Sequence, residues 1–509
     1  MSSASSPAPH EVHVGGPGSL LGVSGLLRRI FSFPGTLCGL LLVLAVLTVK
    51  SRFNDPDMWW HLKMGQIIWT AHKVPVTDIF SFTTNHHAWT PHEWLSQLTI
   101  YMAYLWGGYS GLMLWLVCFT AAIFIGGYVL CSLNSGNLKV SFVGAMVIFL
   151  FATSGLAIRP QMIGYLFLIL ELIFIQLGRT RSPRWFWCLP PLFALWINCH
   201  GSFFLGILVI GAFLFSSFFQ FQFGSLIAKR WDPHGRKILI FALLMSLAAL
   251  FLNPDGIQPI IYPIDTFMHQ PLGLSMVQEW QPLQLTTQRG VFLLLVLAGV
   301  FLLVAIRKAE LRFDELILLA AATWLAGSHT RMVFVFGILA APILSRMLAD
   351  SWEGYNLATD RWWPNALMMA AALLLAWLAF PSKAEMTRQA EEKSPVKAVE
   401  YIQSHHLSGP MLNDYGFGGY LIWAAPEHPV FVDGRGDVFE WTGVLEEFAG
   451  WATMQTDPNK LLDKYRIEFC LLNSQSPMAH VLALLPAWKS VYSDGNAVIF
   501  VRIHAKTAN

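Results

Sequence analysis

The chain has 509 residues, of which 55% are hydrophobic and only 13% are charged, and its net charge is +2. Soluble proteins carry about 25% charged residues. This composition, with a mean hydropathy of +0.51, therefore excludes an ordinary soluble fold and indicates an integral membrane protein. The small net charge gives no reason to expect nucleic acid as a partner.

The N-terminal segment 1–29 is predicted to be disordered and cytoplasmic because it is rich in Ser, Pro and Gly. Arg28 and Arg29 then precede an apolar run without a small-residue cleavage site, which predicts an uncleaved first helix. Further runs approach the roughly 20 residues that a membrane span prefers. The eleven runs are 32–50, 110–131, 140–157, 160–178, 185–199, 202–220, 237–252, 290–306, 313–327, 331–347 and 364–380.

The segment 93–106 is apolar enough to span the membrane or to lie along its surface. Basic residues concentrate in cytoplasmic loops, so their distribution decides between the two arrangements. If 93–106 spanned, Arg179, Arg181 and Arg184 would fall outside the cell. We therefore predict that it lies on the outer surface of a transmembrane domain of about eleven helices, residues 30–380, with the N-terminus cytoplasmic. Its long outer loops are 51–109 and 253–289.

After Pro381 the composition becomes that of a soluble domain. The segment 382–395 is charged and resembles a linker. Beyond it, helical and alternating patterns predict a small α/β domain, residues 381–509, on the extracytoplasmic side. The expected helices are 396–405 and 460–466, and the expected strands are 410–413, 429–433, 467–472 and 497–502.

Polar residues gather on the predicted outer face of the transmembrane domain. Ionisable groups near hydrocarbon are costly and usually mark a functional cavity, so we expect an outward-facing pocket embedded in the membrane. Its predicted catalytic residues are Asp55 and Asp57. The predicted substrate-binding residues are His61, His92, Glu93, Arg159, Asn198, His200, Asn253, Asp255, Glu279, His329 and Arg331.

Asp55 and Asp57 flank Pro56 at the start of a predicted helix. Two carboxylates in this arrangement suit a divalent cation such as Mg²⁺ or Mn²⁺, or one of them suits general-base chemistry. The structural alternative is that they cap the helix, since Asp is favoured at a helix N-terminus.

The other candidates also have structural alternatives. Arg159 and Arg331 suit a phosphate or carboxylate that they would grip in bidentate fashion, but arginines at helix ends also extend to the interface. Asn198 and His200 offer hydrogen bonds to a hydroxyl-rich ligand, whereas Asn253-Pro254-Asp255-Gly256 is first of all a turn sequence. Glu279-Trp280 suits a sugar contact or an interface anchor. The turn Asp433-Gly434-Arg435-Gly436-Asp437 receives no function from its Arg-Gly-Asp sequence.

This layout resembles the GT-C superfamily of membrane glycosyltransferases. The likeness covers the architecture of residues 30–380 and one local pattern, Asp55-Pro-Asp57-x-Trp59-Trp60-His61. The segments Trp196-Ile-Asn198-Cys-His200-Gly201 and Asp433-Gly-Arg435 are similar to those of uncharacterised bacterial multi-span proteins often grouped near this class. The commonest first-loop pattern of the superfamily has Glu directly after Asp, so which Asp is equivalent stays open.

The resemblance implies a bacterial inner-membrane enzyme of the cell envelope. It would transfer a sugar from a polyprenyl-phosphate-linked donor to a glycan, lipid or protein acceptor. Asp57 or Asp55 would be the general base, and Arg159, Arg331 and His329 would hold the phosphate. The alternatives are a non-catalytic membrane assembly or binding protein for envelope polysaccharide, and a transporter, although the paired halves with interrupted helices of transporters are not visible in the sequence.

Overall fold

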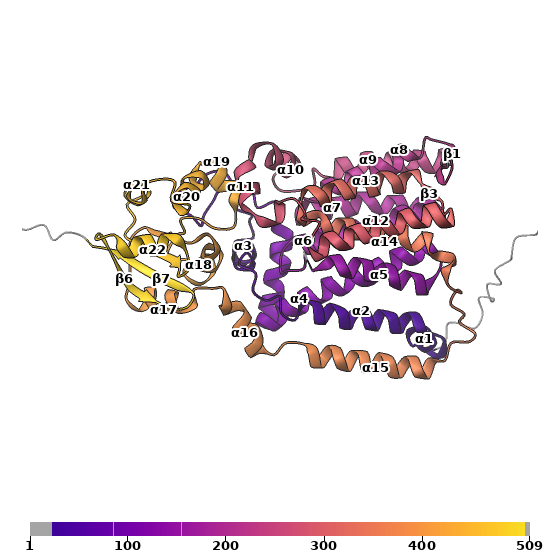
Figure 1. The fold of residues 1–509 in the computed structure, drawn as a ribbon, viewed down its shortest axis with the longest axis horizontal. Coiled ribbons are helices and arrows are strands. Elements are labelled where there is room, and N and C mark those ends of the chain that lie inside the picture. Colours follow the sequence, from indigo (N-terminus) through magenta and orange to yellow (C-terminus); the bar gives the residue numbers. More distant parts are fainter. Residues whose placement is uncertain (1–22, 85, 154, 504–509) are drawn as a thin grey trace, which may run out of the picture.

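A helical bundle forms one end of the molecule and a small α/β domain the other, as the computed structural model of residues 23–84, 86–153 and 155–503 shows (Figure 1). Of the segment 1–29, which was predicted to be disordered, residues 1–22 lie outside the described residues, whereas residues 23–29 belong to the helix α1 (Val23–Ile30) and correct that prediction. Helices occupy all eleven predicted apolar runs. They are α2 (Phe33–Val49), α4 (Trp94–Ser135), α5 (Leu138–Ala152), α6 (Gln161–Thr180), α7 (Leu189–Cys199), α8 (Phe203–Ser216), α9 (Pro233–Ala249), α12 (Gln288–Arg307), α13 (Phe313–Ser328), α14 (Val333–Met347) and α15 (Trp362–Ala379).

Several of these helices match the thickness of a bilayer. In the described part of the chain, five helical segments have at least 18 residues and sufficient hydropathy to cross it. They include α4, α6, α12 and α15, and the fifth is the segment Thr330–Met347 that contains α14. The shorter apolar helices α2, α5 and α8 lie beside them in the bundle. The protein is therefore a membrane protein with multiple membrane-spanning helices.

The helix α4 is kinked at Gly108, whose φ of 56° and ψ of −134° are not helical. Glycine tolerates this positive φ because it has no Cβ. The kink lies two residues beyond the predicted surface segment 93–106. Figure 1 shows the first part of α4 lying across the end of the bundle beside α3 (Met58–Ala71). Trp106, at the end of this part, is 91% exposed, as expected of an aromatic anchor at a membrane interface.

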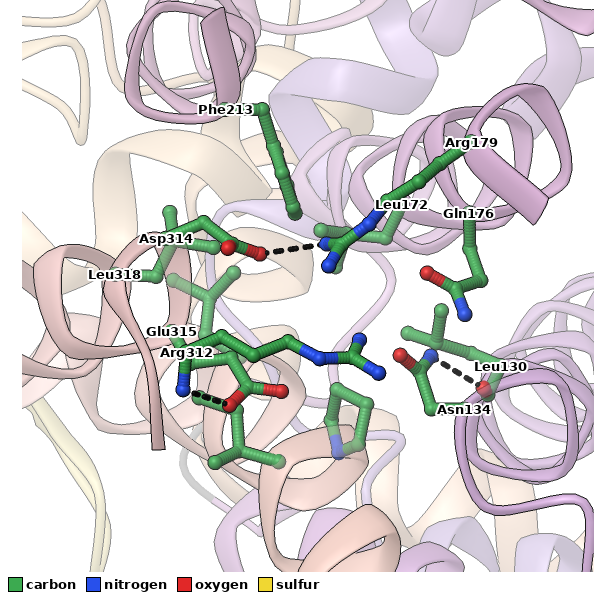
Figure 2. A pocket seen from close by; sticks show the side chains of 13 residues that line it. Leu130, Asn134, Leu172, Gln176, Arg179, Phe213, Arg312, Asp314, Glu315 and Leu318 are labelled. Carbon is green, nitrogen blue, oxygen red and sulfur yellow. Dashed lines mark hydrogen bonds and ion pairs between the residues drawn. The ribbon is translucent and has the colours of Figure 1, made fainter. Parts of the chain in front are cut away.

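The end of the bundle farther from the α/β domain, here called the far end, is closed by ion pairs. Arg179 Nη1 lies 2.8 Å from Asp314 Oδ2, and Arg346 Nη2 lies 2.5 Å from Glu315 Oε2. Figure 2 shows Arg179 pointing at Asp314 across a small pocket of about 30 Å³. A three-stranded sheet that the sequence did not predict lies at this end, with β1 (Phe221–Phe223), β2 (Leu226–Ala228) and β3 (Leu311–Arg312) in the order β1-β2-β3.

The C-terminal α/β domain is built around a sheet of order β4-β5-β7-β6. The strands β4 and β5 are parallel and the other neighbours are antiparallel. The predicted helices and three of the four predicted strands are present, whereas β6, α18, α19, α20 and α22 were not predicted. The elements are α16 (Lys383–Glu392), α17 (Val396–Ser404), β4 (Met411–Asn413), α18 (Gly418–Ala424), α19 (Gly436–Trp441), α20 (Val444–Ala452), α21 (Pro458–Lys464), β5 (Phe469–Asn473), α22 (Pro477–Leu484), β6 (Trp488–Ser493) and β7 (Ala497–Arg502).

Two predictions about this part of the chain need correction. The charged segment 382–395 contains the helix α16, in which the buried Gln389 donates to Lys50 O (2.9 Å) and accepts from Phe53 N (3.1 Å). The predicted strand 429–433 forms only a single bridge, between Val430 and Ser81. Its pairing partner is the first long loop, so it adds no strand to the sheet of the domain.

The first long loop shares a hydrophobic core with the C-terminal domain. Trp60, Met64, Ile68, Phe80 and Trp89 belong to the same cluster of buried side chains as the β-sheet of that domain, separate from the core of the bundle. The second long loop also contributes, through α10 (Gln258–His269) and α11 (Pro271–Met276). The backbone amides of α11 donate to the carboxylate of Glu440 in α19. The end of the bundle nearest this domain, here called the domain-side end, is therefore covered by three distant parts of the chain.

Candidate functional site

Arg159 joins the two first-loop acids at the domain-side end. It lies just before α6, and its Nε is 2.7 Å from Asp55 Oδ2 while its Nη1 is 3.0 Å from Asp57 Oδ2. Asp55 Oδ1 also accepts a hydrogen bond from the Asp57 amide (2.9 Å). Both oxygens of Asp55 are thus engaged. The Asp57 side chain is 23% exposed against 13% for Asp55, so Asp57 is the more accessible of the two.

The carboxylate of Asp57 does not cap α3, although Asp57 occupies the position before its first residue. Burial raises the pKa of Asp57 to about 6, and the positive charge of Arg159 opposes this rise. A carboxylate with a pKa near neutrality is ionised at pH 7 and is still basic enough to accept a proton. Because it makes no hydrogen bond to the first turn of α3, the Asp57 side chain does not act as a helix cap.

A turn of the C-terminal domain packs directly on Asp57. A Cβ on Gly434 would lie 2.1 Å from Asp57 Oδ1, so only glycine allows this close approach of backbone to carboxylate. The same turn was given no role on sequence grounds. Its position shows that the C-terminal domain forms one wall of the candidate site.

Arg435 fixes that turn. It is 1% exposed and forms ion pairs with Asp433 (2.6 Å) and with Asp78 of the first loop (2.5 Å). Its guanidinium also lies 4.8 Å from the centre of the Trp89 ring and 4.9 Å from that of Phe80. Arginine suits this position because its planar group bonds two carboxylates and stacks on aromatic faces. The segment Asp433-Gly-Arg435, quoted above for its resemblance, was the one sequence signal that pointed here.

A second group of ionisable residues joins the first long loop to the residue that follows α7. Glu93 Oε1 lies 3.5 Å from His200 Nε2 and 3.9 Å from His92 Nε2. Burial raises the pKa of Glu93 to about 8 and lowers that of His92 to about 4. Both groups are therefore neutral at pH 7, and Glu93 carries a proton that it can donate. The buried His61 Nδ1 lies 3.3 Å from Nε2 of Gln97, whose backbone amide donates to the carbonyl oxygen of Glu93 (3.1 Å).

Arg331 lies at the same end of the bundle, beside the start of α6. Its Nη2 donates to Gln161 Oε1 (2.7 Å), and its Nη1 lies 3.5 Å from Glu279 Oε2. The guanidinium is 5.4 Å from the centre of the Trp280 ring. His329 Nδ1 lies 2.9 Å from the carbonyl oxygen of Trp280. Three predicted residues, Glu279, His329 and Arg331, therefore form one connected group. The charges of Arg159 and Arg331 both lower the pKa of Glu93, whereas burial raises it.

Two predicted ligands are engaged in holding the backbone. Asn198 accepts from Trp94 Nε1 (2.8 Å) and donates to the carbonyl oxygens of Ala194 and Leu252. Asn253 donates to the carbonyl oxygens of Leu250 and Gly256, so it closes the turn that its sequence predicted. These contacts use the amide groups that a substrate would need. Both asparagines position the chain.

The residues do not fit a metal ion at the first-loop acids. Throughout residues 23–84, 86–153 and 155–503, no group of three or more His, Cys, Asp and Glu side chains is arranged to hold one. Asp55 and Asp57 both face the guanidinium of Arg159. A divalent ion would have to compete with this fixed positive charge for the two carboxylates. We therefore derive no step through Mg²⁺ or Mn²⁺.

Solved structures identify the fold. The oligosaccharyltransferase AglB of Archaeoglobus fulgidus, in complex with an inhibitory peptide and a dolichol-phosphate, aligns over 92% of this chain and 74% of its own, with a TM-score of 0.53 and 11% identity. An oligosaccharyltransferase of the same organism, tethered to an acceptor peptide, aligns over 94% of this chain and 75% of its own, with a TM-score of 0.51 and 11% identity. The chain has the GT-C fold. ArnT from Cupriavidus metallidurans, bound to undecaprenyl phosphate, aligns over 91% of this chain and 96% of its own, with 13% identity and a TM-score of 0.49.

No protein-family model matches the chain, and no curated protein is significantly similar to it in sequence. At 11% identity the structural likeness establishes the fold alone. The chemistry must be argued from the residues of this chain.

Proposed function

We propose that this protein is a membrane glycosyltransferase that moves a sugar from a polyprenyl-phosphate-linked donor to an acceptor at the domain-side end. The observation that carries this proposal is Asp57, a partly exposed carboxylate with a raised pKa between the helical bundle and the C-terminal domain. Its position fits a general base. The dolichol-phosphate in the AglB complex supports a lipid phosphate as the donor carrier.

The proposed reaction is a single displacement. The acceptor's nucleophilic atom attacks the anomeric carbon of the sugar and loses its proton to the carboxylate of Asp57. The bond between that carbon and the phosphate oxygen breaks, and its electron pair leaves with the polyprenyl phosphate. Such a reaction needs a base on one side and fixed positive charge on the other, where the leaving group develops negative charge.

Arg331 is the proposed ligand of the leaving phosphate. Its partner Glu279 lies at 3.5 Å and its other contact is with a neutral amide, so less of its charge is neutralised than that of Arg159. Arg159, with two acidic partners, holds Asp57 in the ionised form and orients it. His329, bonded to the Trp280 carbonyl, supports the loop that carries Glu279.

We further propose that the N-terminus is cytoplasmic, that eleven helices span the plasma membrane and that the C-terminal domain is extracytoplasmic. The arginines of the far end, among them Arg179, Arg312 and Arg346, support this orientation because basic residues concentrate on the cytoplasmic side. A reporter that is active only outside the cytoplasm should work after residue 385 and be silent after Arg184. Activity after Arg184 would contradict the orientation.

Native mass spectrometry of the purified protein tests the donor class. We expect co-purified polyprenyl phosphate, or saturable binding when that lipid is added. The variant Asp57→Asn should still bind the lipid and should lose product formation. An unmodified protein that binds no lipid phosphate, or an Asp57→Asn variant with full turnover, would refute the proposed function.

A further inference from the structure

A cavity of about 280 Å³ lies at the domain-side end and is not used by the mechanism above. A water molecule accounts for about 30 Å³ of the liquid, so the cavity exceeds a water site several-fold. It approaches the lower end of the roughly 300–1,000 Å³ typical of small-molecule sites. The first long loop, α10 and α19 form its walls.

The walls combine carboxylates with aromatic rings. Asp255, Asp265 and Asp437 contribute acids, and Tyr262 and Trp441 contribute rings. None of the described residues that line the cavity is Lys or Arg. The one acid with a basic neighbour on its own helix is Asp265, which lies 2.8 Å from His269 Nδ1. The cavity therefore has an excess of negative charge that no lining cation offsets.

Two polar atoms of the lining residues have no partner in the structure. Asp255 Oδ2 and His92 Nδ1 are both buried and make no hydrogen bond with any described residue. Buried polar atoms without partners are uncommon in native proteins and call for an explanation. A ligand in this cavity would supply the missing contacts.

The cavity is connected to the candidate site through residues on two of its walls. His92 lines it, and the adjacent Glu93 contacts His200 in the second ionisable group. On the other side, Asp437 accepts hydrogen bonds from Trp89 Nε1 (3.1 Å) and Tyr262 Oη (3.4 Å). Asp437 is two residues from Arg435, in the turn whose Gly434 packs on Asp57. The cavity and Asp57 are therefore linked through the same turn of the C-terminal domain.

We propose that this cavity binds the acceptor through a positively charged, amine-bearing group. An ammonium group offsets the charge of the three carboxylates, donates hydrogen bonds to them and is attracted to the face of an aromatic ring. A neutral polyol would form hydrogen bonds but would leave the negative charge uncompensated. The ammonium is bound for recognition, and the nucleophile is a different atom of the acceptor. The part of the inference that concerns an acceptor rests on the proposed function.

The test compares two sugars that differ in one group. Glucosamine and glucose are titrated into the full-length protein in lipid nanodiscs, and binding is measured by saturation-transfer difference NMR. We expect glucosamine to bind about tenfold more tightly, as a charge-assisted hydrogen bond would allow. Asp255→Asn and Asp437→Asn should each remove most of this preference. The control Glu446→Gln, which neutralises an exposed acid of the same domain, should keep it.

Asp255→Asn tests the proposal independently of any folding defect, because the unpaired carboxylate oxygen of Asp255 holds no other residue in place. A folding defect in Asp437→Asn, whose carboxylate bonds Trp89, would therefore leave the test intact. Equal binding of the two sugars, absence of saturable binding, or an equal loss in Glu446→Gln would each overturn the proposal. Lipid-phosphate binding by the unmodified protein is measured separately. Its absence would refute the proposed function and leave a preference for glucosamine standing.

Discussion

The two ends of the helical bundle both carry partly buried ion pairs, but the surroundings of these pairs differ. At the far end, Arg179 pairs with Asp314 and Arg346 pairs with Glu315 around a pocket of about 30 Å³. At the domain-side end, one arginine pairs with two acids, and a cavity of about 280 Å³ lies between the first long loop, α10 and α19. The far-end ion pairs thus surround only a small pocket, whereas the domain-side end has a much larger cavity with unpaired polar atoms in its lining.

This contrast shows that an ionisable residue at a helix end does not by itself mark a site. Asp314 and Asp57 each face an arginine in the structure. What distinguishes Asp57 is that a turn of the C-terminal domain, which contains Gly434, packs on it. Burial raises the pKa of Asp57, and such perturbed groups are typical of functional sites.

The largest expected effect comes from breaking the contact between the turn that carries Arg435 and the first loop. Arg435→Met should lower the free energy of unfolding of the C-terminal domain by about 3–5 kcal/mol, because Asp78 and Asp433 stay buried without their partner. Lys464→Met, which breaks an exposed pair with Glu447, should cost less than about 1 kcal/mol. Chemical denaturation followed by fluorescence measures both. Similar losses in the two variants would contradict the importance of the buried cluster.

The second prediction compares the two ends directly. Asp57→Asn should reduce product formation by roughly 10²-fold or more, since it removes the proposed base. Asp314→Asn removes a carboxylate of similar pairing at the far end, so it should lower the thermal unfolding midpoint and keep turnover per folded molecule. Turnover assays on folded protein separate these effects. Comparable activity losses in both variants would mean that the domain-side acids are structural too.

The third prediction concerns the arginines. Arg331→Lys should weaken binding of a polyprenyl-phosphate analogue by roughly tenfold, because a point-like ammonium cannot reproduce a planar bidentate contact. Arg331→Ala should weaken it further, and Arg159→Ala should act mainly on turnover. Arg179→Lys at the far end is the matched control and should bind normally. Unchanged lipid affinity in Arg331→Ala would make this residue an interface anchor.

The sequence predicted the bundle well because the bilayer imposes a length and a composition on each span. The kink at Gly108 lies close to the end of segment 93–106, which the distribution of arginines had separated from the span. The strands 411–413, 469–473 and 497–502 followed from alternating patterns. These features are local, so a single stretch of sequence contains the signal for them.

The site was predicted only in part because its contacts are not local. Asp78 and Arg435 are 357 residues apart, and Asp55 and Arg159 are 104 apart. No periodicity encodes such pairs. The chain therefore supplied the candidate residues but not their partners, and it assigned no role to the turn that carries Gly434.

The smallest expected effect is the pH dependence of turnover, which tests the ionisable groups of the domain-side end alone. Asp57 must be ionised to accept a proton, and burial raises its pKa to about 6. Turnover should therefore fall to about half near pH 6 and by about tenfold for each further pH unit below it. The pKa of Glu93 is about 8, so turnover should also fall above pH 8 if the Glu93 proton is needed. Glu93→Gln should abolish only the alkaline fall.

Stability gives an independent check on the same group. The folded state binds the proton of Asp57 more tightly than the unfolded chain, whose pKa is near 3.8. The resulting stabilisation is complete below about pH 4 and is lost as pH rises to about 6. Relative to Asp57→Asn, the unmodified protein should lose stability over that interval. If turnover stayed constant down to pH 5 and this difference did not change with pH, Asp57 would be fully ionised throughout, and its burial against Gly434 would have no chemical consequence.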